Sequence, residues 1–422
     1  MPRGEDFTSE GPHGMWEALL EHRSIGRNVA SLRREWRPII LPGVLVCAMA
    51  ATLTIGGVND FDVSEYARYA HAALRAPLFS HLPVEYPAPA LLIFIVPLAA
   101  PGTYQVVFAL LAAITFLTLV VTMEGPSFSE GRVPAQRLVT YFGLGAVAFF
   151  TARYDIFAVL AAFLAVRSAR SQRWSAAWSW SSVGFLLKLF PAVLWPVFFI
   201  GEWKRSGRLP LRRLVWAVTS VALVSGLPAL LSPGATLTEL RFYLHRPVEL
   251  GSMAAGISLL AHWHDWHYVL SYHSMNTLDS VAAPLATALA VVAGAGCLLV
   301  WHSQAKGRLS IEASALATLT LLVLGMKVFS VQYLMWLMPF WALYRLRATL
   351  LAACVINTAI FPYSQFAGLP TYGPAYRYVT LLFLLRDTLI LFGSVMWLRE
   401  VLGARRAALP ASARVSSGIQ SA

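Results

Sequence analysis

The chain has 422 residues, of which 57% are hydrophobic and only 13% are charged, and its mean hydropathy is +0.61. A soluble domain carries about 25% charged residues, so these values exclude a soluble enzyme with one anchor, a disordered chain and a secreted disulfide scaffold. The net charge is +12, but the basic residues lie in short segments between apolar runs, where they orient a membrane protein and do not indicate nucleic-acid binding. The sequence therefore predicts an all-α, polytopic transmembrane helical bundle.

The first 37 residues contain six arginines and six acids without an apolar core, so we expect a cytoplasmic segment (1–37) that is not a cleavable signal peptide. The first apolar run, 38–58, is long enough to span, because about 20 helical residues cross about 30 Å of hydrocarbon. It opens a predicted membrane domain over 38–398, which a cytoplasmic tail (399–422) follows. The three cysteines lie in apolar runs, where a cysteine is typically a small buried hydrophobe.

Basic clusters predict which ends of the later apolar runs face the cytoplasm. They lie at 167–173, 204–213, 306–308 and 345–347 and in the tail. A segment between two such clusters crosses the membrane an even number of times. The runs 138–166, 175–201 and 312–343 should therefore turn, near Arg153, Lys188 and Lys327 respectively. We expect about 12 crossings with both termini inside. The topology of 87–123 stays open: if 124–137 also lies inside, one of its two apolar runs should be interfacial or re-entrant.

Polar residues gather on the outer side. In the loop 59–86, Asp62, Tyr66 and Tyr69 recur at i, i+4 and i+7, which predicts a short amphipathic helix at the membrane surface. The three turns and a larger extracytoplasmic region, 233–280, face the same compartment. Ionisable groups at membrane depth usually mark a pathway or a site. We expect one outward-facing cavity with an acidic lip and a cationic floor, which suits a substrate that is part lipid and part phosphate.

Each of these groups has a chemical and a structural interpretation. Asp62 can accept a proton from a hydroxyl, or it is only a helix cap. Lys188 and Lys327 can hold a departing phosphate, or their ammonium groups only reach toward the interface. Asp60 and Asp62 form a pair that can hold a divalent cation. The histidines in 262–267 lack helical i, i+4 pairing and lie among tryptophans, which favours an interfacial segment over a metal site. We predict no cofactor and no metal ligands, and leave a divalent cation open.

Taken together, the motifs resemble glycosyltransferase family 87, the polyprenol-phosphate-mannose-dependent mannosyltransferases of the GT-C superfamily. The resemblance extends over about residues 56–343. It departs at Pro87-Ala88-Pro89, where the family usually has two adjacent prolines, and at Val331, where Ser-Pro-Gln-Tyr is usual. The motifs that carry it are Asp62-x-x-x-Tyr66-x-x-Tyr69, Glu85-Tyr86-Pro87, Arg153-x-Asp155, Lys188-Leu189-Phe190-Pro191 and the segment from Lys327 to Trp336.

The resemblance implies an inverting transferase in a bacterial plasma membrane, with its active site on the extracytoplasmic face. It would move a sugar, mannose, from a polyprenyl phosphate donor to a hydroxyl of a glycan or glycolipid acceptor, without a nucleotide. The implied roles are a general base at Asp62, a donor-phosphate site at Lys188, Lys327 and Arg153, and a substrate pocket lined by Tyr66, Glu85, Tyr86, Asp155, Gln332 and Tyr333.

Two other functions remain open. A transporter or lipid flippase would also use charges at the midplane and broken helices, but it needs polar groups along a path that reaches both sides. We interpret Arg386-Asp387, within the last apolar run, as a buried structural pair, although a carrier would also use such a pair. A transferase of another class, such as a polymer ligase, would share the outer cavity and differ in its donor.

Overall fold

The computed structural model describes residues 39–57, 60–75, 82–83, 85–100, 102–123, 133–366 and 375–408. The predicted cytoplasmic segment 1–37 lies outside the described residues, and the predicted tail is described only as far as residue 408. Within these ranges the chain is mostly helical, as an α-helical membrane protein should be.

The first part of the chain folds into helices from the opening apolar run to the middle of the sequence. They are a helix over Ile39–Ile55, α2 (Asp60–Leu74), η1 (Ala88–Ala90), α3 (Leu91–Ile95), η2 (Val96–Ala99), α4 (Tyr104–Thr122), α5 (Val133–Gly145), α6 (Asp155–Arg170), α7 (Trp174–Leu187), η3 (Phe190–Leu194), α8 (Trp195–Ser206) and α9 (Leu211–Leu231).

The second part mixes long and short helices with three short strands. They are α10 (Pro233–His245), β1 (Val248–Glu249), α11 (Met253–Ala261), β2 (Tyr268–Ser271), β3 (Ser274–Thr277), α12 (Ala282–Ala305), α13 (Ile311–Gly325), η4 (Val331–Trp336), α14 (Met338–Trp341), α15 (Ala348–Phe366) and α16 (Ala375–Ala408).

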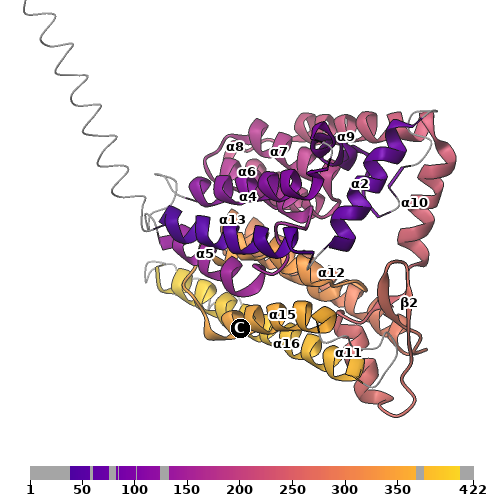
Figure 1. Cartoon of the computed structure of the whole chain (residues 1–422). Coiled ribbons are helices and arrows are strands. Elements are labelled where there is room, and N and C mark those ends of the chain that lie inside the picture. Colours follow the sequence, from indigo (N-terminus) through magenta and orange to yellow (C-terminus); the bar gives the residue numbers. More distant parts are fainter. Residues whose placement is uncertain are drawn as a thin grey trace, which may run out of the picture.

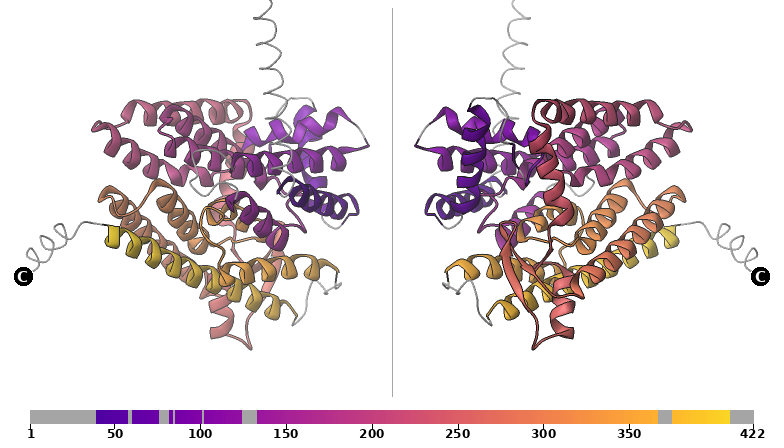
Figure 2. Two further views of the ribbon diagram at one scale, coloured as in Figure 1. Left: turned by 90° about the vertical axis from the view of Figure 1, so that its left-hand side faces the viewer. Right: turned by 90° about the vertical axis from the view of Figure 1, so that its right-hand side faces the viewer.

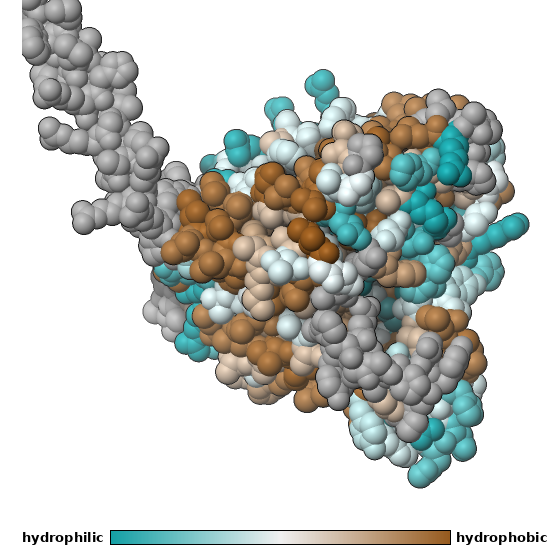
Figure 3. All heavy atoms as spheres, in the orientation of Figure 1, coloured by the Kyte–Doolittle hydropathy of each residue, from teal (hydrophilic) through white to brown (hydrophobic). Residues whose placement is uncertain are grey.

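The helices form two groups, which further elements connect at one end of the molecule (Figure 1). The helices α4 and α6–α9 lie together on one side, α11, α15 and α16 lie on the other, and α12 and α13 run between them; Figure 2 shows the same division from two further directions. At one end, α10 and the strands connect the two sides. Apolar side chains form a broad band over the helices in Figure 3, and polar ones gather toward the end with α10 and the strands.

Four helices among the described residues are long and apolar enough to cross a membrane: α4, α9, α12 and the 375–404 part of α16. The expected 12 crossings therefore stay a prediction, because the other apolar helices are shorter. The first part of the run 87–123 is one of these. Pro87, Pro89 and Pro97 divide it into η1, α3 and η2, and the 12 residues of Ala88–Ala99 cover only about 18 Å, so the full-length helix of that run is α4.

All three apolar runs are interrupted near the predicted turns, and that each run crosses the membrane twice stays a prediction. A non-helical segment, 146–154, separates α5 from α6 around Arg153. The helix α7 ends at Lys188, whose backbone is extended, and Pro191 follows in η3; proline cannot continue a helix because it lacks the N–H and clashes with the preceding turn. The helix α13 ends at Gly325 and gives way to extended backbone before η4.

The all-α prediction misses a small sheet within 233–280. It is antiparallel with strand order β1-β3-β2, and Thr277 of β3 pairs with both Val248 and Tyr268. The β2–β3 hairpin turns at Tyr272 and His273, which both adopt positive φ (52° and 53°). Two-residue hairpin turns of this kind usually contain Asn-Gly, so the sequence lacks the ordinary signal for it.

Candidate functional site

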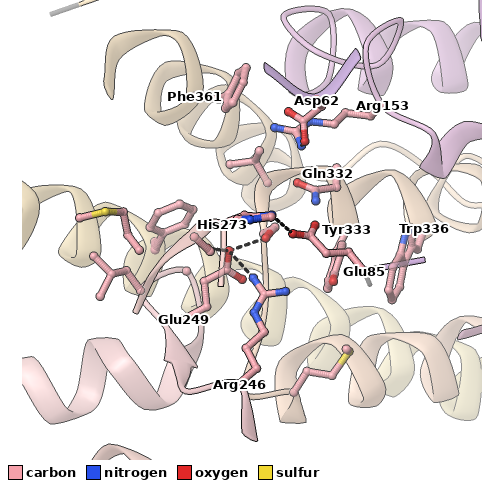
Figure 4. A pocket seen from close by; sticks show the side chains of 18 of the residues that line it. Asp62, Glu85, Arg153, Arg246, Glu249, His273, Gln332, Tyr333, Trp336 and Phe361 are labelled. Atoms are coloured by element: carbon pink, nitrogen blue, oxygen red, sulfur yellow. Dashed lines mark hydrogen bonds and ion pairs between the residues drawn. The ribbon is translucent and has the colours of Figure 1, made fainter. Parts of the chain in front are cut away.

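The first cavity has a volume of about 570 Å³, within the range of small-molecule sites. Figure 4 shows Asp62 and Arg153 at one end of it and Arg246 and Glu249 at the other, with His273 between them. Its charged or titratable lining residues are Asp62, Glu85, Tyr86, Arg153, Lys188, Tyr243, Arg246, Glu249, His273, Tyr333 and Tyr376.

Asp62 stands in the first turn of α2 and Arg153 in the segment before α6, 91 positions away. Arg153 Nη1 donates to Asp62 Oδ1, and the two side chains are 11% and 19% exposed respectively. A hydrogen bond of 2.8 Å between the hydroxyls of Thr54 and Thr151 holds the helix before α2 against the segment that carries Arg153. Burial raises the pKa of the Asp62 carboxyl above its usual value, and Arg153 offsets part of the rise. The carboxylate is thus paired and shielded, with one edge on the cavity.

Lys188 is also paired. Its ammonium lies 2.7 Å from Asp155 Oδ1, and Trp336 Nε1 donates to the same oxygen at 2.7 Å. Asp155 is only 1% exposed and begins α6, where the helix dipole favours a negative charge. Asp155 therefore lies in the wall behind Lys188. This corrects the expectation that Asp155 lines a substrate pocket.

Aromatic rings enclose the Lys188 ammonium. Its Nζ lies 5.1 Å from the ring centroid of Tyr333 and 5.6 Å from those of Tyr86 and Trp336, within the range of cation–π attraction. Trp336 itself is stacked between Phe190 and Tyr333, with both centroids at 4.1 Å. Lys188 is consequently fixed in place, and a substrate would meet a rigid aromatic and cationic floor.

Tyr66 does not reach the cavity, which corrects a second expectation. It is 1% exposed, stacks on Phe94 at 4.6 Å between centroids, and its hydroxyl lies 3.3 Å from that of Tyr86. Tyr86 does line the cavity, as do the predicted residues Glu85, Gln332 and Tyr333. Tyr66 supports this wall from behind. A helix is confirmed in the expected place as α2, whose Tyr66 and Tyr69 are both buried, and its position at the membrane surface stays a prediction.

Glu85 connects the rim of the cavity to two distant elements. His273 Nδ1, at the tip of the β2–β3 hairpin, lies 2.6 Å from Glu85 Oε1. The Tyr243 hydroxyl of α10 donates to the Glu85 carbonyl at 2.7 Å. Burial raises the pKa of Glu85, and His273 and Arg246 partly oppose that rise. The unusual backbone at His273 thus delivers a side chain to the rim.

Glu249 organises the opposite end. Its Oε1 accepts hydrogen bonds from Ser330 Oγ at 2.5 Å and Ser274 Oγ at 2.7 Å, and Arg246 Nη2 lies 3.7 Å away. The sequence places Arg246 in the outer region but gives no reason to select Glu249, His273, Ser274 or Ser330. No spacing signal links them, because strand pairing and the break after α13 bring them together.

A close backbone contact fixes this end of the cavity. A Cβ at Gly251 would lie 2.4 Å from the carbonyl oxygen of Phe329. Arg386 Nη2 donates to the carbonyls of Gly251 at 2.9 Å and Phe329 at 3.2 Å, and Nε donates to Asp387 at 2.9 Å. Arg386 and Asp387 are both fully buried. They are therefore a structural pair, and their contacts hold the 326–330 segment against the residues after β1.

Lys327 lies at a second cavity, of about 1110 Å³, and does not line the first. The backbone is extended at Met326 and at Ser330 but bends at Lys327, which separates the Lys327 side chain from that of Ser330. Ser330 therefore reaches the first cavity and Lys327 the second, where its Nζ donates to the Leu244 carbonyl at 3.2 Å. Burial and Arg246 lower the pKa of Lys327. The expected single cluster of Lys188 and Lys327 is thus wrong.

The second cavity is mostly apolar and joins the first at Arg246. The two cavities share Val193, Arg246, Leu322 and Met326 as lining residues. One wall is a row of mainly small side chains along α12, and a Cβ at Gly294 would meet nothing within 4 Å. The residues of this row are Ala282, Ala283, Ala286, Thr287, Ala290, Ala293, Gly294, Cys297, Leu298 and Trp301.

Among the described residues, no group of three His, Cys, Asp or Glu side chains could hold a metal ion. The side chain of Asp60, which would complete the predicted Asp-x-Asp pair, lies outside the described set. In the 262–267 segment, His262 Nδ1 lies 2.8 Å from Asp279, and Trp266 is buried and donates to Ser258. Comparisons with protein families, curated proteins and solved structures found no match for the chain.

Proposed function

We propose that the chain is an integral-membrane, inverting glycosyltransferase. It would move a sugar, mannose according to the sequence resemblance, from a polyprenyl phosphate to a hydroxyl of a glycan or glycolipid on the extracytoplasmic face. The observation that carries the proposal is the junction at Arg246. There a long apolar cavity meets a cavity that many charged residues line and that contains a buried carboxylate, and a lipid-linked sugar phosphate has a similar division between an apolar tail and a charged head.

The second cavity suits the tail of such a donor. Its lining on α12 runs from Ala282 to Trp301, which is about 30 Å at the rise of an α-helix and matches the thickness of the hydrocarbon core. Thr287, Ala290 and Gly294 are exposed and open this wall toward the surroundings. A lipid chain could therefore enter sideways, from the bilayer, without passing through water.

The donor phosphate would lie between Arg246 and Lys327, both lining residues of the second cavity. This differs from the sequence-based expectation, because Asp155 already neutralises Lys188. An arginine and a lysine can bind a phosphate through charge-assisted hydrogen bonds and stabilise the charge that grows on it as the sugar leaves. Arg246 also faces the first cavity, so the sugar would project into it.

In the first cavity, Asp62 would act as the general base. It accepts the proton of the acceptor hydroxyl, the hydroxyl oxygen attacks the anomeric carbon, and the carbon–oxygen bond to the phosphate breaks with its electron pair leaving on the polyprenyl phosphate. Attack from the face opposite the phosphate inverts the anomeric centre. Arg153 orients the Asp62 carboxylate, and Tyr86, Gln332 and Tyr333 line the space where the sugar would sit.

A transporter would use the same cavities but needs polar groups that reach both sides. The charged residues of the first cavity come from the start of α2, the segments before η1 and α6, the ends of α7 and α10, and the sheet. Arg386 donates hydrogen bonds to Asp387, to Asn357 and to the Gly251 carbonyl. These contacts support a structural role for the Arg386–Asp387 pair over a place on a carrier pathway.

The test is transfer by purified protein in lipid vesicles, supplied with radiolabelled polyprenyl-phosphate mannose and a membrane lipid extract. Asp62→Asn should lower the transfer rate at least about 10²-fold, the usual contribution of a general base. Glu65→Gln is the matched control, because Glu65 lies on the same helix, pairs with Arg68 and does not line the cavity. Full turnover in Asp62→Asn, or no labelled product from the unmodified chain, would refute the proposal.

A further inference from the structure

A third cavity lies between α7, α8 and α9 and has a volume of about 750 Å³. It includes Ser175 and Trp178 in the first turns of α7, whereas Lys188 of the first cavity follows the last turn. The two cavities are thus separated by most of the length of α7, about 20 Å for 14 residues. The third cavity belongs to the opposite end of the bundle, where the basic loop between α8 and α9 turns.

The acid in this cavity, Glu202, already has hydrogen-bond and ion-pair partners within the protein. Glu202 of α8 is 2% exposed, accepts a hydrogen bond from Trp178 Nε1 at 3.0 Å and forms an ion pair with Arg213. A buried carboxylate needs such partners because an unpaired charge is costly in a low-dielectric environment. Glu202 and Arg213 therefore cancel each other, and the acid does not compensate the other cations of the cavity.

Two arginines remain uncompensated. The helix α8 ends at Gly207, whose φ is +68°, and the Ser206 hydroxyl bonds to the backbone of Arg208. This turn places Arg208 beside Arg212, at the start of α9, in the lining of one cavity. Both side chains are exposed, and neither has an ion pair or side-chain hydrogen bond with any residue in the described ranges. The cavity thus holds two positive charges that no described residue balances.

The surroundings favour an anion that carries acyl chains. The helix α9 is long and apolar enough to span a membrane, and only 11% of its apolar window is buried inside the protein. Beside the two arginines, Leu211, Val215 and Trp216 are 54%, 61% and 50% exposed. A tryptophan at the end of a spanning helix is typical of the headgroup level of a bilayer. A phosphate held by Arg208 and Arg212 would therefore have lipid-facing surface directly below it.

We propose that the third cavity binds the headgroup of an anionic phospholipid, with the phosphate between Arg208 and Arg212 and the acyl chains along the exposed face of α9. Basic pockets between membrane helices commonly bind anionic lipids. This site is separate from the proposed donor site and does not depend on the transferase activity. It would hold a lipid that is a fixed part of the protein and not a substrate.

The experiment is native mass spectrometry of the full chain, released from micelles that contain equal amounts of phosphatidylglycerol and phosphatidylcholine. The unmodified protein should retain phosphatidylglycerol in preference to phosphatidylcholine. The double variant Arg208→Gln/Arg212→Gln should lower that retention about 10-fold or more, since each arginine near a headgroup is worth about 1 kcal/mol. Because both side chains are exposed and without partners among the described residues, the fold should survive, which thermal unfolding in detergent would check.

Arg205→Gln is the control, because Arg205 lies in the last turn of α8, three residues before Arg208, bonds to Gln172 and does not line the cavity. It removes one charge and should leave retention of phosphatidylglycerol unchanged. Equal retention of the two lipids, an equal loss in the control, or no loss in the double variant would overturn the proposal. Displacement of the lipid by millimolar glycerol 3-phosphate, a soluble anion with the same phosphate, would also overturn it in favour of a free-anion site.

Discussion

The first and second cavities share Arg246 but are built in opposite ways. In the first, three charged groups have partners from distant segments: Arg153 for Asp62, Asp155 for Lys188, and Ser274 and Ser330 for Glu249. In the second, one helix supplies a long wall of mainly small side chains, and the charged residues Arg246, Asp279 and Lys327 all lie outside that helix. A rigid polar chamber beside a simple apolar groove is the arrangement expected when geometry matters for the head of a ligand and only length matters for its tail.

The residue at the junction should show the largest effect. Arg246→Gln removes the guanidinium that faces both cavities, so we expect transfer to fall about 10²- to 10³-fold, as for other groups that stabilise charge in a transition state. The measurement is kcat/KM with the polyprenyl phosphate donor. Arg241→Gln, at an exposed position of α10 five residues before Arg246, should leave kcat/KM unchanged. An equal loss in both variants would mean that the charge of α10, and not its position, matters.

Filling the groove should affect only long donors. Gly294→Phe places a ring in the space beside α12 where a Cβ meets nothing within 4 Å, so KM for a full-length donor should rise about 10-fold, the loss of a few buried methylenes. KM for a donor with one or two isoprene units should not change. Gly226→Phe is the control, since Gly226 on α9 has equal space and does not line the groove. A similar rise with the short donor would refute the assignment of the tail.

Arg153 should set the pH dependence of the first cavity. Transfer needs Asp62 ionised, so activity should rise with pH through the pKa of that group, which burial raises and Arg153 lowers. Arg153→Gln should therefore move the acidic limb of kcat/KM to higher pH, by about one unit for the loss of an adjacent opposite charge. Arg68→Gln removes a charge from α2 that pairs with Glu65 and should leave the limb in place. A shift to lower pH would contradict the role of Asp62.

Substitutions at the rim of the first cavity should have the smallest effect on transfer. His273→Asn removes the contact with Glu85 and keeps a side chain that tolerates positive φ. The His273 side chain is 48% exposed, and exposed ion pairs contribute about 0–1 kcal/mol, so transfer should fall no more than about fivefold. His262→Asn is matched, because His262 pairs with Asp279 at a similar exposure of 43% but does not line the first cavity. A loss as large as that of Arg246→Gln would make His273 part of the chemistry.

The sequence predicts the breaks in the apolar runs well, because parity between basic clusters demands them and Pro191 and Gly325 provide them. It also predicts that Asp62, Arg153, Lys188, Gln332 and Tyr333 line one cavity. The prediction fails where the local backbone of one residue decides which cavity its side chain faces. Lys327 resembles Lys188 in its neighbours, yet it lies at a bend after α13 and its side chain lines the second cavity.

Other features of the site have no recognisable pattern in the sequence. Glu249 belongs to a strand of two residues, too short for an alternating pattern, and the hairpin tip lacks glycine and asparagine. Asp155 and Tyr66 have the right spacing for a cavity but lie behind its wall, since only the packing around Trp336 and Phe94 shows which side they face. The sequence does not determine the number of crossings for a related reason. Basic clusters at both ends of a run show that the chain returns to the same side, but not whether it reaches the other side of the membrane.

The contact at Gly251 has a consequence for recognising distant relatives. Any side chain at Gly251 would collide with the Phe329 carbonyl oxygen, to which Arg386 also donates a hydrogen bond. A substitution of Gly251 would therefore displace the Phe329 segment and the Arg386 contact with it. A glycine before the N-cap serine of α11 and an arginine in the closing helix should thus change together across evolution, even where the acidic and basic groups of the cavities have diverged. This pair would serve as a fingerprint for chains too dissimilar to align by their overall sequence.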